Sequence, residues 1–113
     1  MSVIAVLTNL PDSESAFNLA RALIRRRVAA CVNVLGPATS FYRWEGREEE
    51  ASEVPVIIKS TRDRYPELER VIRENHPYEI PEIVALPVEQ GLEKYLGWVA
   101  EECKPGAGSA DAP

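Results

Sequence analysis

The sequence is poor in the residues that build disulfide frameworks, metal centres and nucleophilic active sites. Its 113 residues include two cysteines, Cys31 and Cys103, and one histidine, His76. A single cysteine pair does not make the disulfide framework of a small secreted domain. The chain also lacks a Gly-rich phosphate loop, an H-E-x-x-H motif and a Cys-x-x-Cys pair. Because no nucleophile stands beside a base in the sequence, we expect a protein that is not an enzyme.

Long apolar runs and positive charge are also scarce. No stretch approaches the ~18 apolar residues that a membrane span requires, and the first residues lack the basic region of a signal peptide. The 13 lysines and arginines are outnumbered by 18 acidic residues, which gives a net charge of -5. Nucleic-acid binding depends on lysines and arginines that neutralise phosphates. We therefore expect a cytoplasmic protein that binds neither a membrane nor nucleic acid.

The order of apolar periodicities predicts one α+β domain. Strands are expected at about residues 3–7, 29–43, 53–60 and 82–87, and helices at about 13–27, 63–75 and 92–103. This order, βαββαβ plus a C-terminal helix, is typical of a ferredoxin-like split β-α-β sandwich. Right-handed connections then place the first two helices on one face. The other face is left for an oligomer or for the last helix.

The domain is expected to cover residues 1–103. Residues 104–113 are rich in Gly, Ala, Ser and Pro, so we expect them to form a disordered C-terminal tail. In the first helix, Ala16, Phe17, Ala20, Leu23 and Ile24 share helical spacing and should form its apolar face.

The two central strands should form a hairpin with an irregularity part-way along it. A two-residue turn at 45–46 sets Pro37 opposite Val54 and Gly36 opposite Pro55. Proline cannot donate to a strand ladder and is confined to edges or bulges. We therefore expect a bend or bulge at this level, which divides the hairpin into a base and a projecting tip.

The expected hairpin is longer than the domain that supports it. Fourteen residues span roughly 46 Å when fully extended, whereas a domain of this length has a diameter of roughly 34 Å. The tip should overhang the core and expose Phe41, Tyr42 and Trp44. Exposed aromatic side chains and unpaired strand edges favour association with another chain. A partner subunit is the simplest explanation.

Cys31 and His76 are the residues with the chemistry of a soft-metal site. A thiolate and a neutral imidazole both suit copper or zinc. Their spacing matches no zinc motif, and two ligands do not fill four positions. The missing ligands would come from Glu79, Glu82, water or a neighbouring subunit. The alternatives are a small buried core residue for Cys31 and a helix-end side chain bonded to a carbonyl for His76.

Lys59 ends an apolar strand, and two interpretations of it stay open. It could pair with a carboxylate, or it could bind an anion in a cleft between subunits. The glutamates at 48–50 similarly fit a solvated strand edge or, less well, an acidic metal site. The arginines at 25–27 fit the last turn of a helix, where the helix dipole favours cations, better than a phosphate-binding patch.

Five segments together resemble the CutA family of divalent-cation tolerance proteins. They are A-A-C-V-N at 29–33, S-F-Y-R-W-E-G at 40–46, V-I-I-K-S-T at 56–61, H-P-Y-E-I-P-E-I at 76–83 and Y-L-G-W at 95–98. The resemblance covers about residues 1–102. It implies a ferredoxin-like fold and a tight homotrimer similar to the PII signalling proteins, in which the long hairpins pair between subunits. This agrees with the overhang inferred from chain length.

The resemblance also implies a cytosolic protein that is linked to tolerance of divalent metals and binds copper in some members. Cys31 and His76 match positions implicated as metal ligands, and Glu82 is the third candidate metal ligand. Some copper-linked members carry a further cysteine near the end of the first strand, where this chain has Thr8. We therefore expect weaker copper binding than a two-thiol site would give.

A second hypothesis also follows from the resemblance. Trp44, Lys59 and Tyr78 match motif residues around clefts between subunits. A PII-like trimeric module would bind a small anionic ligand in these clefts near Lys59, and its hairpins would contact an unidentified protein partner. Apart from copper or another divalent metal, no organic cofactor is evident from the sequence.

Overall fold

The computed structural model describes residues 2–105, so most of the tail expected at 104–113 lies outside the described residues. Its elements follow in order: β1 (Val3–Leu10), α1 (Ser13–Arg25), β2 (Cys31–Val34), β3 (Ala38–Trp44), β4 (Arg47–Thr61), a short 3-10 helix (Arg62–Arg64), α2 (Tyr65–Glu74), β5 (Val84–Pro87) and α3 (Glu93–Glu102). No helix in this part of the chain is long and apolar enough to cross a membrane.

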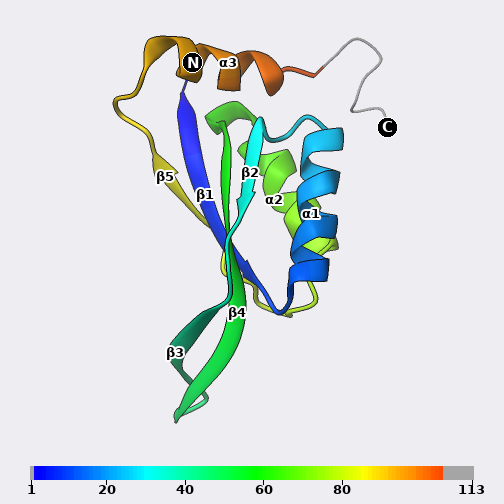
Figure 1. Ribbon diagram of the computed structural model, residues 1–113, viewed down its shortest axis with the longest axis vertical. Coiled ribbons are helices and arrows are strands. Elements are labelled where there is room, and N and C mark those ends of the chain that lie inside the picture. The colour runs from blue at the N-terminus through cyan, green and yellow to red at the C-terminus, as the bar shows by residue number, and fades with distance from the viewer. Residues whose placement is uncertain (1, 106–113) are drawn as a thin grey trace.

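The strands form one antiparallel sheet that is covered by helices on one face. The order across the sheet is β2-β4-β1-β5, and β3 pairs only with β4. Helices α1 and α2 lie on the same side of the sheet, while α3 runs across one end (Figure 1). This arrangement confirms the predicted split β-α-β sandwich with an additional C-terminal helix.

Strand alternation separates a buried face from an uncovered face. On the helix side of β1, Ile4, Val6, Thr8 and Leu10 are buried against α1 and α2. The start of α1 is fixed by Asp12, whose carboxylate accepts the N–H of Ser15 at 2.8 Å. The side chain of Asp12 therefore caps the helix.

The predicted apolar face of α1 is partly wrong. Leu19 and Leu23 are buried with Ala16, whereas Phe17 and Ile24 are almost half exposed. The buried positions follow i, i+3, i+7 spacing, and Phe17 and Ile24 lie beside that stripe. Two large apolar side chains of α1 are thus left at the surface of a single chain.

The opposite face of the sheet has no helix over its centre. Two rows of cross-strand neighbours face this side: Leu86, Ala5, Lys59 and Cys31 in one, and Val84, Leu7, Ile57 and Asn33 in the other. Helix α3 packs beyond them, where Val99 and Cys103 meet Val3 in a second small core. The uncovered face is mainly apolar, with one polar corner at β2 and β4.

The predicted irregularity is a β-bulge between β2 and β3. Cross-strand pairing runs from Cys31 with Lys59 to Val34 with Val56, and resumes at Ala38 with Glu53. Three residues at 35–37 therefore oppose two at 54–55. At the base of the hairpin the strand pairing is shifted by one residue from the predicted register. The N–H of Leu35, not of Gly36, donates to the carbonyl of Pro55 at 2.9 Å.

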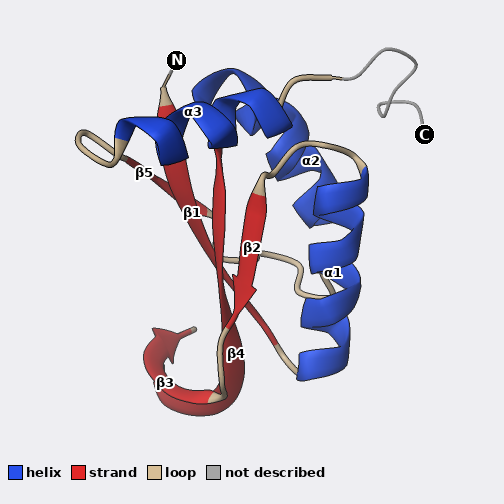
Figure 2. Ribbon diagram, turned by 45° about the horizontal axis from the view of Figure 1, so that its top comes forward, coloured by secondary structure: helices blue, strands red, loops and turns tan. Residues whose placement is uncertain are grey.

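Beyond the bulge, β3 and the first half of β4 form a two-stranded ribbon, residues 38–53. The ribbon continues after β1 has ended at Leu10 opposite Val54, and it curls away from the sheet (Figures 1 and 2). Its turn pairs Trp44 with Arg47 as predicted, and Gly46 has φ of 80°. The overhang is confirmed, and the molecule measures 47 × 32 × 23 Å.

Several boundaries differ from the sequence prediction. β1 ends at Leu10 instead of residue 7, and β4 begins at Arg47 instead of residue 53. Asp63 lies in the 3-10 helix and does not cap α2, which begins at Tyr65. In each case pairing with a neighbouring strand or a local turn overrides residue preference.

Candidate functional site

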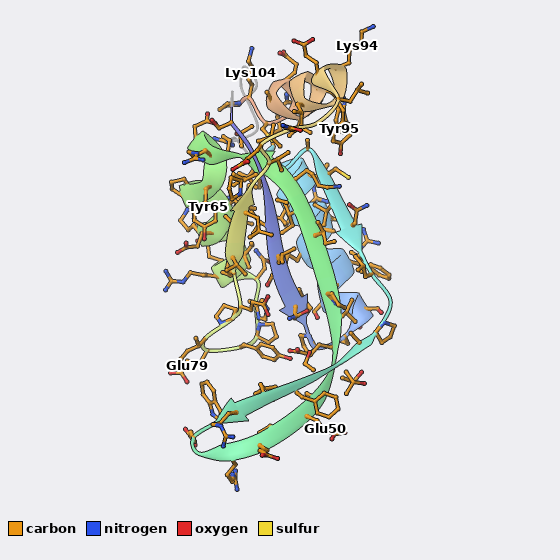
Figure 3. The ribbon with its side chains drawn as sticks, turned by 90° about the vertical axis from the view of Figure 1, so that its left-hand side faces the viewer. Glu50, Tyr65, Glu79, Lys94, Tyr95 and Lys104 are labelled. Carbon is orange, nitrogen blue, oxygen red and sulfur yellow. The ribbon has the colours of Figure 1, made fainter. Side chains whose placement is uncertain are left out.

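A cavity of about 840 Å³ lies between the ribbon and the loop at 77–82. Tyr42 and Trp44 reach it from β3 and Glu53 from β4, while Tyr78 and Glu82 come from the loop. Figure 3 shows the loop that carries Glu79 above the curled ribbon. The size is that of a small-molecule site, and the cavity opens on the side of the sheet that the helices leave uncovered.

Two hydrogen bonds hold the loop beside the strands. The hydroxyl of Tyr78 donates to Glu53 Oε2 at 3.2 Å, and the amide of Asn9 donates to Glu82 Oε1 at 2.8 Å. Burial and the adjacent negative charge of Glu53 raise the pKa of Tyr78. The loop is thus attached to β4 at one point and to β1 at another.

His76 lies beside this cavity with both ring nitrogens occupied. Its Nδ1 accepts the backbone N–H of Tyr78 at 3.2 Å, so the proton resides on Nε2, which donates to the carbonyl of Asn9 at 2.6 Å. This is the alternative in which the imidazole is bonded to a carbonyl. To bind a metal, His76 would have to release one of the two bonds.

Cys31 lies in the polar corner of the uncovered face. It is directly opposite Lys59 across the ladder, and it is only partly buried. Asn33 Oδ1 accepts a hydrogen bond from Lys59 Nζ at 3.0 Å and a weak one from Cys31 Sγ at 3.8 Å. The cysteine is therefore not a core residue of the chain, and its thiol faces the same side as the cavity.

Cys31 and His76 are far apart in one chain. Cys31 is level with Ala5, four residues along β1 from Asn9, to which His76 is bonded. Four strand residues and two strand spacings amount to a separation on the order of 15 Å. Among residues 2–105, no three His, Cys, Asp or Glu side chains are grouped to hold a metal ion. One chain therefore does not form a site from Cys31, His76 and Glu82.

The position of Thr8 bears on the expected second thiol. Thr8 is 1% exposed and faces α1 and α2, whereas Cys31 faces the uncovered side. A cysteine in place of Thr8 would be separated from Cys31 by the sheet. The substitution alone would not create a two-thiol site within one chain.

Sequence reasoning missed two residues that organise this region. Asn9 accepts from His76 through its carbonyl and holds Glu82 through its side chain, and Glu53 holds Tyr78. The available signal for Asn9 is a polar residue shortly after the apolar strand predicted at 3–7.

Comparison with known proteins identifies the family. The family described as CutA1 divalent ion tolerance protein matches residues 4–102. The chain belongs to this family. The mouse relative named Protein CutA is 46% identical over 98 residues, which cover 87% of this chain and 55% of that protein. The chain thus spans about half the length of this CutA relative.

Two solved CutA structures agree with the fold. A divalent cation tolerance protein (Cut A1) from Thermus thermophilus matches with a TM-score of 0.87 and 41% identity, covering 88% of this chain and 97% of its own. A protein from Archaeoglobus fulgidus matches with a TM-score of 0.87 and 33% identity, covering 90% and 99%. The second is described as a periplasmic divalent cation tolerance protein, so the CutA fold is not tied to the cytoplasm, and a cytoplasmic location here stays a prediction.

Proposed function

We propose that this CutA protein is a homotrimer that binds copper or another divalent cation at sites shared between subunits, and that it takes part in the response to metal ions. The observation that carries the proposal is the position of the soft donors. Cys31 and the neighbourhood of His76 lie on one uncovered side of the molecule but too far apart to hold one ion within a chain. A second subunit would supply the missing ligands.

The surface of the single chain supports the assembly. Val84 and Leu86 are nearly half exposed on the uncovered face, next to the partly buried Leu7 and Ile57. On the ribbon, Phe41 is 74% exposed. Apolar patches of this kind mark interfaces. Within the described part of the chain, the outer edge of β3 has no strand partner, so it can pair with a ribbon of another copy.

The test begins with the mass of the purified protein in solution, measured by light scattering. Cu(II), Cu(I) and Zn(II) are then titrated into the wild type and into Cys31→Ser, His76→Ala and Glu82→Gln. We expect a trimer whose copper affinity falls roughly tenfold or more in the first two variants. Cys103→Ser, which removes the buried thiol of the second core, should bind like the wild type.

Two results would reject the proposal. A stable, folded monomer at micromolar concentration would remove the shared sites. Equal affinity in the wild type, Cys31→Ser and His76→Ala would remove these residues from any site that the protein has.

Lys59 favours a second candidate function, a PII-like module that binds a small anion. Its ammonium group donates to Asn33 and has no ion-pair partner among the described residues, so its charge is available on the uncovered face. A thermal-shift screen with nucleotides and organic anions tests this, because a ligand that binds only the folded state raises stability. An anion that raises the unfolding temperature of Lys59→Met as much as that of the wild type would count against a site at Lys59.

A further inference from the structure

The cavity under the ribbon is walled by aromatic rings. Tyr42 and Trp44 share one face of β3 because they alternate with Phe41 and Arg43. Tyr78 faces them from the loop at 77–82, which lies above the ribbon in Figure 3. Aromatic faces carry a negative quadrupole and attract cations within about 6 Å of the ring centre. They offer no lone pair suited to inner-sphere metal coordination.

The charged groups of this cavity are carboxylates. Among residues 2–105, Glu53, Glu79 and Glu82 line it, and no lysine or arginine does. Glu79 also lines a neighbouring hollow together with Arg70 and Arg73. Within the described part of the chain, the hydrogen-bond partners of Glu53 and Glu82 are neutral, the Tyr78 hydroxyl and the Asn9 amide. Two carboxylates therefore remain uncompensated beside the rings.

We propose that this cavity binds a small organic cation, an alkylammonium or guanidinium group. Its charge would lie between the carboxylates of Glu53 and Glu82, and its hydrocarbon part would lie against Trp44 and Tyr42. The volume of about 840 Å³ accommodates a molecule and far exceeds a bare ion. The pKa of Tyr78 is raised mainly by burial and, to a lesser degree, by the negative charge of Glu53. The ligand class is opposite in charge to the anion considered for Lys59.

This inference rests on neither the trimer nor the shared metal site. The free edge of β3 stays available to another copy, whereas Phe41 lines the cavity with Tyr42 and Trp44. Cys31 lies at the far end of the sheet. Glu82 belongs to both proposed sites, so Cys31→Ser and Glu53→Gln, which each change only one site, are the variants that let the two kinds of binding fail separately.

The experiment follows Trp44 fluorescence during titration with tetramethylammonium chloride and with 1,4-diaminobutane at low ionic strength. The chain has two tryptophans, and Trp98 on α3 is replaced by Phe in every sample, so Trp44 alone reports. Neopentyl alcohol, a neutral molecule of similar shape to tetramethylammonium, and sodium chloride serve as ligand controls. We expect saturable quenching by the two cations only.

The key variant is Glu53→Gln, and Glu50→Gln is its matched control on the same strand. Glu50 is not among the described residues that line the cavity, whereas Glu53 lines it and accepts a hydrogen bond from Tyr78. Affinity for both cations should fall about fivefold to tenfold in Glu53→Gln and stay unchanged in Glu50→Gln. Cys31→Ser should also leave it unchanged.

Three outcomes would overturn the inference. They are equal binding of neopentyl alcohol and tetramethylammonium, equal losses in Glu53→Gln and Glu50→Gln, and absence of saturable quenching in a protein that still binds copper. Light scattering on each variant confirms that its assembly is intact. Loss of copper binding with retained cation binding would reject only the metal proposal.

Discussion

The hydroxyl of Thr8 should destabilise the protein, and Thr8→Val should make it more stable. Thr8 is buried on the helix side of β1 between Val6 and Leu10, opposite Val56. Its Oγ1 finds no hydrogen-bond partner among the described residues. A buried hydroxyl without a partner loses its hydrogen bonds to water and gains none in the folded state, which destabilises the fold. Valine keeps the branched shape and replaces the hydroxyl with a methyl group.

The expected gain follows from that cost. An unsatisfied buried polar group lowers the free energy of unfolding by about 1–3 kcal/mol. Packing the larger methyl group into a full core reduces the stability gained by removing the hydroxyl. We therefore expect about 1–2 kcal/mol per chain. At about 4 °C per kcal/mol for a domain of this size, the midpoint of thermal unfolding should rise by roughly 4–8 °C.

Thermal and urea unfolding of wild type, Thr8→Val and Thr8→Ser measure this gain at one fixed protein concentration, since assembly makes stability concentration-dependent. Thr8→Ser keeps the hydroxyl and loses the methyl group, so it should be about 1 kcal/mol less stable than wild type. A Thr8→Val protein that is no more stable than wild type would show that the hydroxyl has a partner and refute the reasoning.

Three further predictions concern α1 and α3. The pKa of Asp12 is lowered because its carboxylate accepts the N–H of Ser15. The ionised carboxylate therefore stabilises the fold above pH ~4, and this stabilisation is lost as pH falls through the lower folded pKa. Asp12→Asn, which still caps the helix, should lose less stability than the wild type between about pH 6 and pH 2, as urea unfolding would measure. Arg27 donates to carbonyls at the end of α3, at 2.7 Å for the shorter bond, so Arg27→Ala should cost about 1 kcal/mol and speed amide exchange in α3. Burial raises the pKa of Cys103, so a thiol reagent near neutral pH should modify Cys31 first and reach Cys103 only on unfolding, as mass spectrometry would show.

The features of the hairpin that depend on neighbouring residues were predictable from the sequence. A two-residue turn containing Gly46 fixes the register of every pair in the ribbon. Neither Pro37 nor Pro55 has a backbone N–H to donate to a regular ladder, and this predicts the position of the bulge to within one residue. The length of β4 was not predictable, because the glutamates at 48–50 have low strand preference and are held by pairing with β3.

The candidate site was predictable only in part, since it depends on contacts between distant residues. Trp44, Tyr78 and Glu82 line the same cavity, and the family resemblance had placed Trp44 and Tyr78 with Lys59 around clefts between subunits. In one chain Lys59 lies elsewhere, opposite Cys31 on the sheet, and a cleft that unites them between chains stays a prediction. The bond from His76 to Asn9 spans 67 positions, and no local pattern indicates it.

The bulge at 35–37 sets the direction of the ribbon by a simple count, three residues against two. Deletion of Gly36 would leave every recorded pair of β2 and β3 in register and remove the kink. The ribbon would then extend straight from the sheet and its aromatic side would turn away from the loop at 77–82. The deletion of one codon could thus redirect the ribbon toward a new neighbour without changing any side chain of the ribbon or of the cavity.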